Sequence, residues 1–154
     1  MRLPKYFAEI DAHIELINEA LEVLQNRLPI ENYNDLTNLE KFALNTLIFR
    51  FSKLQDLLGS KVFRSYLEFS GFETSEKSFF DILKEIEKEG IVDIDTWDEL
   101  RKLRNQIAHE YPEEEDEAIE SINLFIERSQ ELIDIADRLR ERYFAIERAR
   151  KENH

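Results

Sequence analysis

The apolar residues of this chain recur every three or four positions along most of its length, and this spacing restricts the possible folds more than any other feature. Over residues 6–26 they form one continuous stripe made of Ile10, Ile14, Ile17, Leu21 and Leu24. A stripe of this period is typical of an amphipathic α-helix. Only three glycines and three prolines occur among the 154 residues, and these are the residues that break helices. The sequence therefore predicts an all-α fold.

A second helix is expected after Pro29 and the polar residues 32–35, with Thr37 or Asn38 as its N-cap. Its apolar residues cover more than half of its circumference, so we expect it to be the central element of the fold. Gly59 predicts a stop or a kink. A short helical continuation is expected beyond it, ending at Ser70 and Gly71.

Three further helices are predicted in the second half of the chain. One begins at Ser78 and ends at Gly90, and the next is capped by Asp95 or Thr96 and is broken by Pro112. The last begins in an acidic cluster, which suits the positive end of a helix dipole. Its stripe continues to residue 146, and the polar tail from about residue 148 is expected to fray.

The connections between these segments are short, which favours antiparallel neighbours. We therefore expect a single domain over residues 1–154, built as an up-down antiparallel four-helix bundle with an additional short helix. The apolar stripe of the last helix is longer than one bundle of this size needs. This excess predicts that the chain forms a homodimer.

Charge and composition exclude several classes of protein. The chain has 34 acidic and 21 basic residues, giving a net charge of −13, which argues against a protein that coats nucleic acid without specificity. It has no cysteine, so disulfides and thiolate chemistry are excluded. The N-terminal residues lack the apolar segment of a signal peptide, and no stretch approaches the roughly 20 apolar residues that span a bilayer. We expect a cytoplasmic protein that does not enter a membrane.

Residues 104–111, Arg-Asn-Gln-Ile-Ala-His-Glu-Tyr, form the one polar cluster whose side chains suggest a reaction. A neutral His109 can remove a proton from a ribose 2′-hydroxyl as a general base. The guanidinium of Arg104 can bind a phosphate and stabilise the charge of the transition state. Asn105, four residues before His109, lies on the same helical face and can orient the histidine or the phosphate.

The side chains of Arg104 and His109 can meet only if the helix geometry allows it. Arg104 and His109 are five residues apart, about 140° around an ideal helix. They converge if the helix ends near Ala108 or His109, as Pro112 suggests, or if Arg104 curls across. From the residues alone, an ordinary solvated helix end remains open, because a histidine there is favoured by the helix dipole.

No cofactor or metal is expected, because the scheme requires neither. The other two histidines, His13 and His154, are far from the motif in the sequence, and no metal-ligand spacing is present.

The arrangement of Arg104, Asn105, His109 and Tyr111 resembles the signature of the HEPN superfamily: an arginine, a four-residue gap that usually opens with asparagine, a histidine, and a tyrosine two residues later. The flanking Leu103 and residues 108–112, and the upstream residues 48–56, are similar to one branch of that superfamily. With the helix count, the resemblance covers roughly residues 36–139.

This resemblance implies a metal-independent endoribonuclease that works as a homodimer, with the motifs facing a shared cleft. It implies Arg104 and His109 as catalytic residues and Asn105 as a supporting residue. The expected partner is a small nucleotidyltransferase, as in toxin–antitoxin pairs, and Tyr111 is the expected adenylylation site. The alternative is a non-catalytic helical subunit that binds a nucleotidyltransferase, labelled as its substrate-binding or antitoxin component. RNA, either tRNA or mRNA, is the expected substrate of the enzyme.

Arg50, Lys53 and Asp56 recur at intervals of three on the predicted central helix and can support the cleft. A solvated ion-pair face explains them equally well. Seven acids between residues 110 and 120 are expected to cap the last helix rather than to bind a cation. The aromatic residues are expected in the core and in a dimer contact rather than in a surface that stacks nucleobases. They are Phe49, Phe51, Phe63, Phe69, Phe72, Phe79 and Phe80.

Overall fold

The computed structural model describes residues 2–110 and 116–153, without the side chains of residues 109, 110, 116 and 117. Every regular element within these ranges is helical, which confirms the predicted fold class for this part of the chain. The α-helices are α1 (Leu3–Leu24), α2 (Asn38–Leu57), α3 (Phe63–Ser70), α4 (Phe79–Lys88), α5 (Ile94–Glu110) and α6 (Asp116–Glu152). The shorter elements are η1 (Gln25–Arg27), η2 (Tyr33–Asp35) and the π-helical turn η3 (Leu58–Val62).

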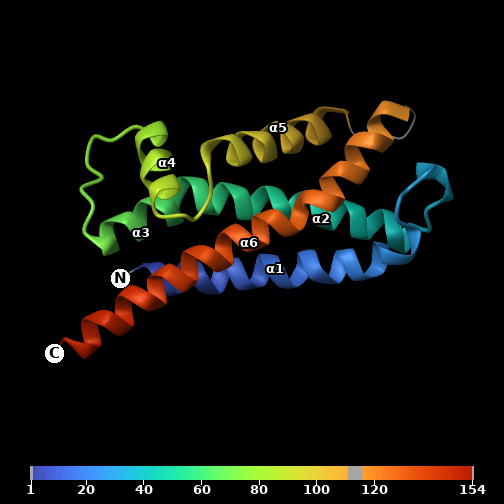
Figure 1. Cartoon of the computed structure of the whole chain (residues 1–154). Coiled ribbons are helices and arrows are strands. Elements are labelled where there is room, and N and C mark those ends of the chain that lie inside the picture. The colour runs from blue at the N-terminus through green and yellow to red at the C-terminus, as the bar shows by residue number, and fades with distance from the viewer. Residues whose placement is uncertain (1, 111–115, 154) are drawn as a thin grey trace.

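The long helices α1, α2, α5 and α6 alternate in direction and form a helical bundle, with α6 crossing the others obliquely (Figure 1). Helices α3 and α4 lie together at the end of the bundle where α5 begins (Figure 1). One apolar core joins the helices. Its aromatic centre includes Phe51 of α2 against Phe125 of α6, with ring centroids 4.6 Å apart, and Phe63 of α3 against Trp97 of α5 at 4.9 Å.

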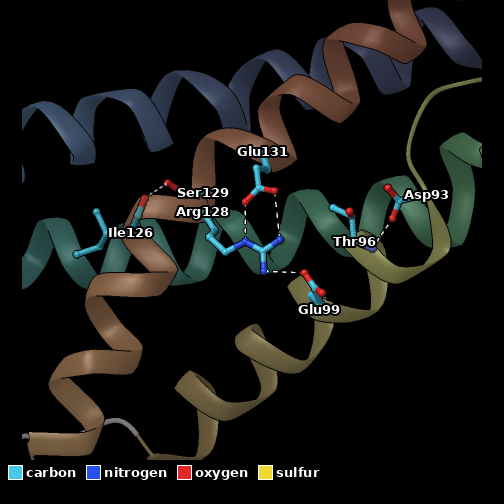
Figure 2. Close-up of polar contacts among 7 residues, drawn as sticks. All are labelled: Asp93, Thr96, Glu99, Ile126, Arg128, Ser129 and Glu131. Carbon is cyan, nitrogen blue, oxygen red and sulfur yellow. Dashed lines mark hydrogen bonds and ion pairs between the residues drawn. The ribbon is translucent and has the colours of Figure 1, made fainter.

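Side-chain caps fix where the helices begin. Thr37 caps α2 in a capping box with Glu40, and Ser78 caps α4 in a box with Asp81, as predicted. The predicted cap of α5 at Asp95 or Thr96 is wrong. Asp93 performs this role, because the backbone N–H of Thr96 donates to its Oδ1 at 2.6 Å and α5 therefore begins at Ile94 (Figure 2).

Gly59 does not stop the second helix. The chain passes through the wider turn η3 and continues as α3 to Ser70, where Gly71 closes the helix with a φ of 99°. At Gly59 the backbone of η3 packs closely against Trp97, since a Cβ there would lie 3.1 Å from Cζ2 of Trp97. The predicted end at Ser70 and Gly71 is confirmed.

The C-terminal tail is helical to Glu152 rather than frayed from about residue 148. Arg150 accounts for part of this order. It donates a hydrogen bond to the backbone carbonyl of Phe69, and its guanidinium lies 4.3 Å from the centroid of the Phe69 ring. The end of α6 is therefore attached to the end of α3.

Further polar contacts hold α6 against other parts of the bundle. Arg128 lies 3.0 Å from Glu99 of α5 and 2.6 Å from Glu131 of α6 (Figure 2). The amide of Asn123 pairs with the backbone of Ile30, accepting from its N–H and donating to its carbonyl, both at 2.8 Å. None of the helices in the described ranges has an apolar stretch sufficient to cross a lipid bilayer.

Candidate functional site

Arg104 of α5 is held against the central helix α2. Its Nη1 donates to Oδ1 of Asp56 at 2.6 Å, and its Nη2 donates to Oδ1 of Asn105 at 3.3 Å. The Arg104 side chain is 20% exposed, whereas that of Asp56 is 63% exposed. The guanidinium therefore has a fixed position beside α2, with an exposed carboxylate as its partner.

His109 is the second-last residue of α5, so Arg104, Asn105 and His109 belong to one continuous helix. Helix α5 extends to Glu110, one residue past His109, and residues 111–115 lie outside the described part of the chain, so the convergence of Arg104 and His109 stays a prediction. On a regular helix, positions 104 and 109 are about 140° apart. The side chain of His109, the residue Tyr111 and the break expected at Pro112 lie outside the described residues.

The other two candidate residues on α2, Arg50 and Lys53, do not contact Arg104 in the interactions described. Arg50 lies with its Nη1 3.3 Å from Nδ1 of His13 on α1. Arg50 and Lys53 are each 5.4 Å from the ring centroid of Phe49. Burial, and then the positive charge of Arg50, lower the pKa of His13. The structure thus brings Asp56 to Arg104 and gives Arg50 and Lys53 other neighbours.

Beside Arg104 lies a pocket of about 370 Å³ that no pattern in the sequence indicates. Residues of α2, η3, α4 and α5 line it. They include Gln55, Asp56, Phe79, Trp97, Arg101 and Arg104. Its volume falls in the range of about 300–1,000 Å³ that small-molecule sites occupy. The candidate catalytic arginine is therefore part of a larger concave site.

Two buried polar side chains of this pocket lack hydrogen-bond partners among the described residues. They are Gln55, through both Oε1 and Nε2, and Trp97, through Nε1. Gln55 is 2% exposed and Trp97 is 1% exposed. Leaving a buried donor or acceptor unpaired is unfavourable by about 1–3 kcal/mol, so each such group needs an explanation.

The sequence contained a signal for Gln55 that periodicity alone overlooks. Gln55 follows Leu54 and lies four residues after Phe51 on α2, at a helical spacing where an apolar side chain is expected. Phe79 was expected in the core or in a dimer contact, and Trp97 is a buried neighbour of it. Phe79 is 38% exposed and contributes to the pocket wall.

The aromatic residues expected in the core and in a dimer contact differ in their exposure. Phe51 and Phe63 are buried, as expected, whereas Phe49 and Phe80 are each 53% exposed. The residues outside the core are therefore available for contacts with a ligand or a second molecule.

Comparisons of the chain with protein-family models, with curated proteins and with solved structures found no match. Among the described residues, no cluster of three or more histidine, cysteine, aspartate or glutamate side chains is arranged to hold a metal ion. The motif and the surroundings of Arg104 are therefore the features of this chain that point to a function.

Proposed function

We propose that this protein is a metal-independent endoribonuclease of the HEPN type, the toxin of a pair whose other member is a small nucleotidyltransferase. The observation that carries the proposal is the position of Arg104. It lies beside an open pocket, on the same helix as Asn105 and His109, at the spacing of the HEPN motif.

In the proposed reaction, neutral His109 takes the proton of a ribose 2′-hydroxyl as general base. The 2′-oxygen attacks the adjacent phosphorus, and the bond from phosphorus to the 5′-oxygen of the next nucleotide breaks. The leaving oxygen takes up a proton. The products are a 2′,3′-cyclic phosphate and a 5′-hydroxyl.

Arg104 stabilises the negative charge that grows on the phosphate oxygens in the transition state. A guanidinium has five N–H donors, so Arg104 can keep one bond to Asp56 while others contact a phosphate. Asp56 acts here as a positioning residue that holds the guanidinium at the edge of the pocket, 2.6 Å from its own carboxylate oxygen.

A homodimer supplies the shared cleft that the proposal needs. Along α2, the exposed apolar residues Leu39, Phe42 and Phe49 follow helical spacing and lead towards Lys53 and Asp56. Leu39 is 65% exposed and Phe42 is 66% exposed, values unusual for such large apolar side chains. A second copy covering this stripe would bring the two arginine sites near one another.

Control by the partner nucleotidyltransferase acts through Tyr111 in this proposal. An adenylate on Tyr111 adds an anionic phosphate and bulk two residues from His109, which repels RNA and obstructs the cleft. The cognate nucleotidyltransferase is therefore the expected protein partner, and RNA is the expected substrate.

The test is RNA cleavage in the presence of EDTA by four proteins: the wild type, His109→Ala, Arg104→Ala and Arg148→Ala. Arg148 is an exposed arginine of α6 and serves as the matched control. We expect cleavage by the wild type, with 2′,3′-cyclic phosphate ends. We expect a loss of about 100-fold or more in the His109 and Arg104 variants and no comparable loss in the control. Cleavage that persists without His109 would contradict the proposal, as would cleavage that EDTA abolishes.

A second candidate is a non-catalytic helical subunit that binds a nucleotidyltransferase through the same motif. The net charge of −13 favours it, because an acidic surface repels RNA. Intact RNA in the cleavage assay, together with tight binding of the cognate nucleotidyltransferase that Arg104→Ala weakens, is the result expected for this candidate.

A further inference from the structure

We propose that His13, Arg50 and Lys53 form a second phosphate-binding site, on the face shared by α1 and α2, which holds the backbone of single-stranded RNA beside the cleavage position. This inference rests on the proposed function and deepens it, because it gives the substrate strand a contact outside the Arg104 pocket. Three properties of these side chains support it: their hydrogen bonding, their charge and their position along α2.

The side chains of His13 and Arg50 meet across the two helices. Nη1 of Arg50 lies 3.3 Å from Nδ1 of His13. A guanidinium can only donate, so Nδ1 accepts this bond and the neutral ring carries its proton on Nε2. Among the described residues, the buried side-chain atoms without a partner belong to Gln55 and Trp97, so Nε2 of His13 is reached by solvent. This Nε2–H group and the remaining guanidinium N–H groups are donors for an anionic oxygen.

Arg50 and Lys53 are cations that form no ion pair with a carboxylate in the part of the chain that the structure describes. By contrast, Arg128 and Arg140 are each paired with an acidic side chain. The sequence has 34 acidic and 21 basic residues, so carboxylates are in excess. The two cations instead lie beside the exposed ring of Phe49, each 5.4 Å from its centroid. They therefore form a local positive surface that attracts an anion.

The half-buried ring of His13 gives this surface a group whose charge responds to a ligand. Burial is the largest cause of its lowered pKa, and the positive charge of Arg50 is the next. Glu9 of α1 opposes this shift, and Lys53 of α2 adds to it. A bound phosphate supplies a negative charge and favours the protonated ring. Binding of a strand should therefore raise the pKa of His13.

The position of these cations on α2 connects them to the proposed catalytic arginine. Arg50, Lys53 and Asp56 follow one another at intervals of three residues, so each is a neighbour of the next on the helix surface. Arg50 and Asp56 are separated by about 9 Å along the helix axis. Asp56 holds Arg104 at 2.6 Å. One strand can thus place the phosphate to be cleaved at Arg104 and a neighbouring phosphate at the second site.

Binding of a short fluorescein-labelled 2′-O-methyl RNA strand tests the second site, because such a strand has no free 2′-hydroxyl to react. Fluorescence anisotropy is measured over a series of salt concentrations for the wild type and for Arg50→Gln, Lys53→Gln and Lys84→Gln. Lys84 is the matched control, an exposed lysine of α4 that lies 4.7 Å from the ring centroid of Phe80.

We expect Arg50→Gln and Lys53→Gln each to weaken binding of the strand by about 10-fold, because each removes a charged donor to a phosphate. Each should also reduce the slope of log K against log salt by about 0.7, the value for one phosphate contact on a single strand. Lys84→Gln should change neither the affinity nor the slope.

An NMR titration of His13 tests the same site without altering it. The chain has three histidines, and the imidazole signal that is lost in His13→Gln identifies His13. We expect a saturating concentration of the strand to raise the pKa of His13. Inorganic phosphate at the same phosphate concentration should leave it unchanged, because one free anion lacks the second contact at Arg104. A purely structural pairing of His13 with Arg50 predicts no response to the strand.

Several results would overturn the inference: no binding of the strand, an unchanged pKa of His13 at saturation, an equal response to inorganic phosphate, or wild-type affinity and salt slope in both α2 variants. A loss of dimer mass in Arg50→Gln, with strand binding unchanged, would assign these side chains to a contact between copies and also contradict it. None of these measurements requires cleavage, so their failure is distinct from an absence of ribonuclease activity.

Discussion

At the scale of single residues, Arg104 and Asp56 form a short ion pair, and the Asp56 carboxylate is largely exposed to solvent. An ion pair with such exposure contributes about 0.2–1 kcal/mol to stability, so its main effect is on orientation. The unpaired amide of Gln55 opposes folding by more than this pair stabilises it. A buried amide without a partner is unusual, so Gln55 is a position where substitution by an apolar residue should not destabilise the fold.

His13 gives a prediction at the same scale. Burial and the guanidinium of Arg50 lower its pKa below the ordinary histidine value of 6.5, so the folded state binds fewer protons than the unfolded state just below that pH. Stability should therefore fall as the pH decreases through about 6.5 towards the folded pKa. His13→Gln removes this contribution and should make the unfolding free energy less dependent on pH between about 7.5 and about 5.5.

Urea unfolding curves for the two proteins across this pH range provide the measurement. Identical pH dependence for wild type and His13→Gln would contradict the prediction. The carboxyl groups common to both proteins contribute equally and cancel in the comparison.

At the scale of secondary structure elements, the N-terminus of α2 is held by a capping box between Thr37 and Glu40. The hydroxyl of Thr37 accepts from the backbone N–H of Glu40, and the Glu40 carboxylate accepts from the backbone N–H of Thr37 at 2.8 Å. That carboxylate also accepts from Arg27 of η1, so the cap joins α2 to the end of α1. The hydrogen bond from the Thr37 backbone is the largest cause of the lowered pKa of Glu40.

Thr37→Ala should destabilise the protein by about 1 kcal/mol, because it leaves the backbone N–H of Glu40 without its side-chain acceptor. Thr46→Ala within the same helix is the matched control and should change stability by less than about 0.5 kcal/mol. Chemical denaturation of both variants measures the difference. Equal stability of the two would show that the capping box does not contribute.

At the scale of the whole molecule, the exposed stripe on α2 determines how copies of the chain meet in the proposed enzyme. Phe42→Glu should convert a dimer into a monomer, because it places a charge within the apolar contact. Phe80→Glu changes an exposed phenylalanine of α4 in the same way and should leave the dimer intact. Light scattering at micromolar concentration measures both masses. A wild-type protein that is monomeric under these conditions would remove the dimer from the proposal.

The sequence by itself determined the local features of this protein. Apolar spacing located the helices, and Thr37 and Ser78 identified two of their caps, because a helix and its cap depend on residues three or four positions apart. It missed Asp93 as the cap of α5 by two residues, since several neighbouring side chains can cap and packing selects among them.

The tertiary structure alone decided how the candidate site is assembled. Arg104 and Asp56 are 48 positions apart in the chain, and Gln55 and Trp97 meet in one pocket because α2 and α5 pack together. Such contacts depend on which apolar faces bury one another, and a periodic pattern does not specify this. The motif was therefore visible as a set of residues on one helix, whereas its ion pair, its pocket and the unpaired amide beside it follow from packing.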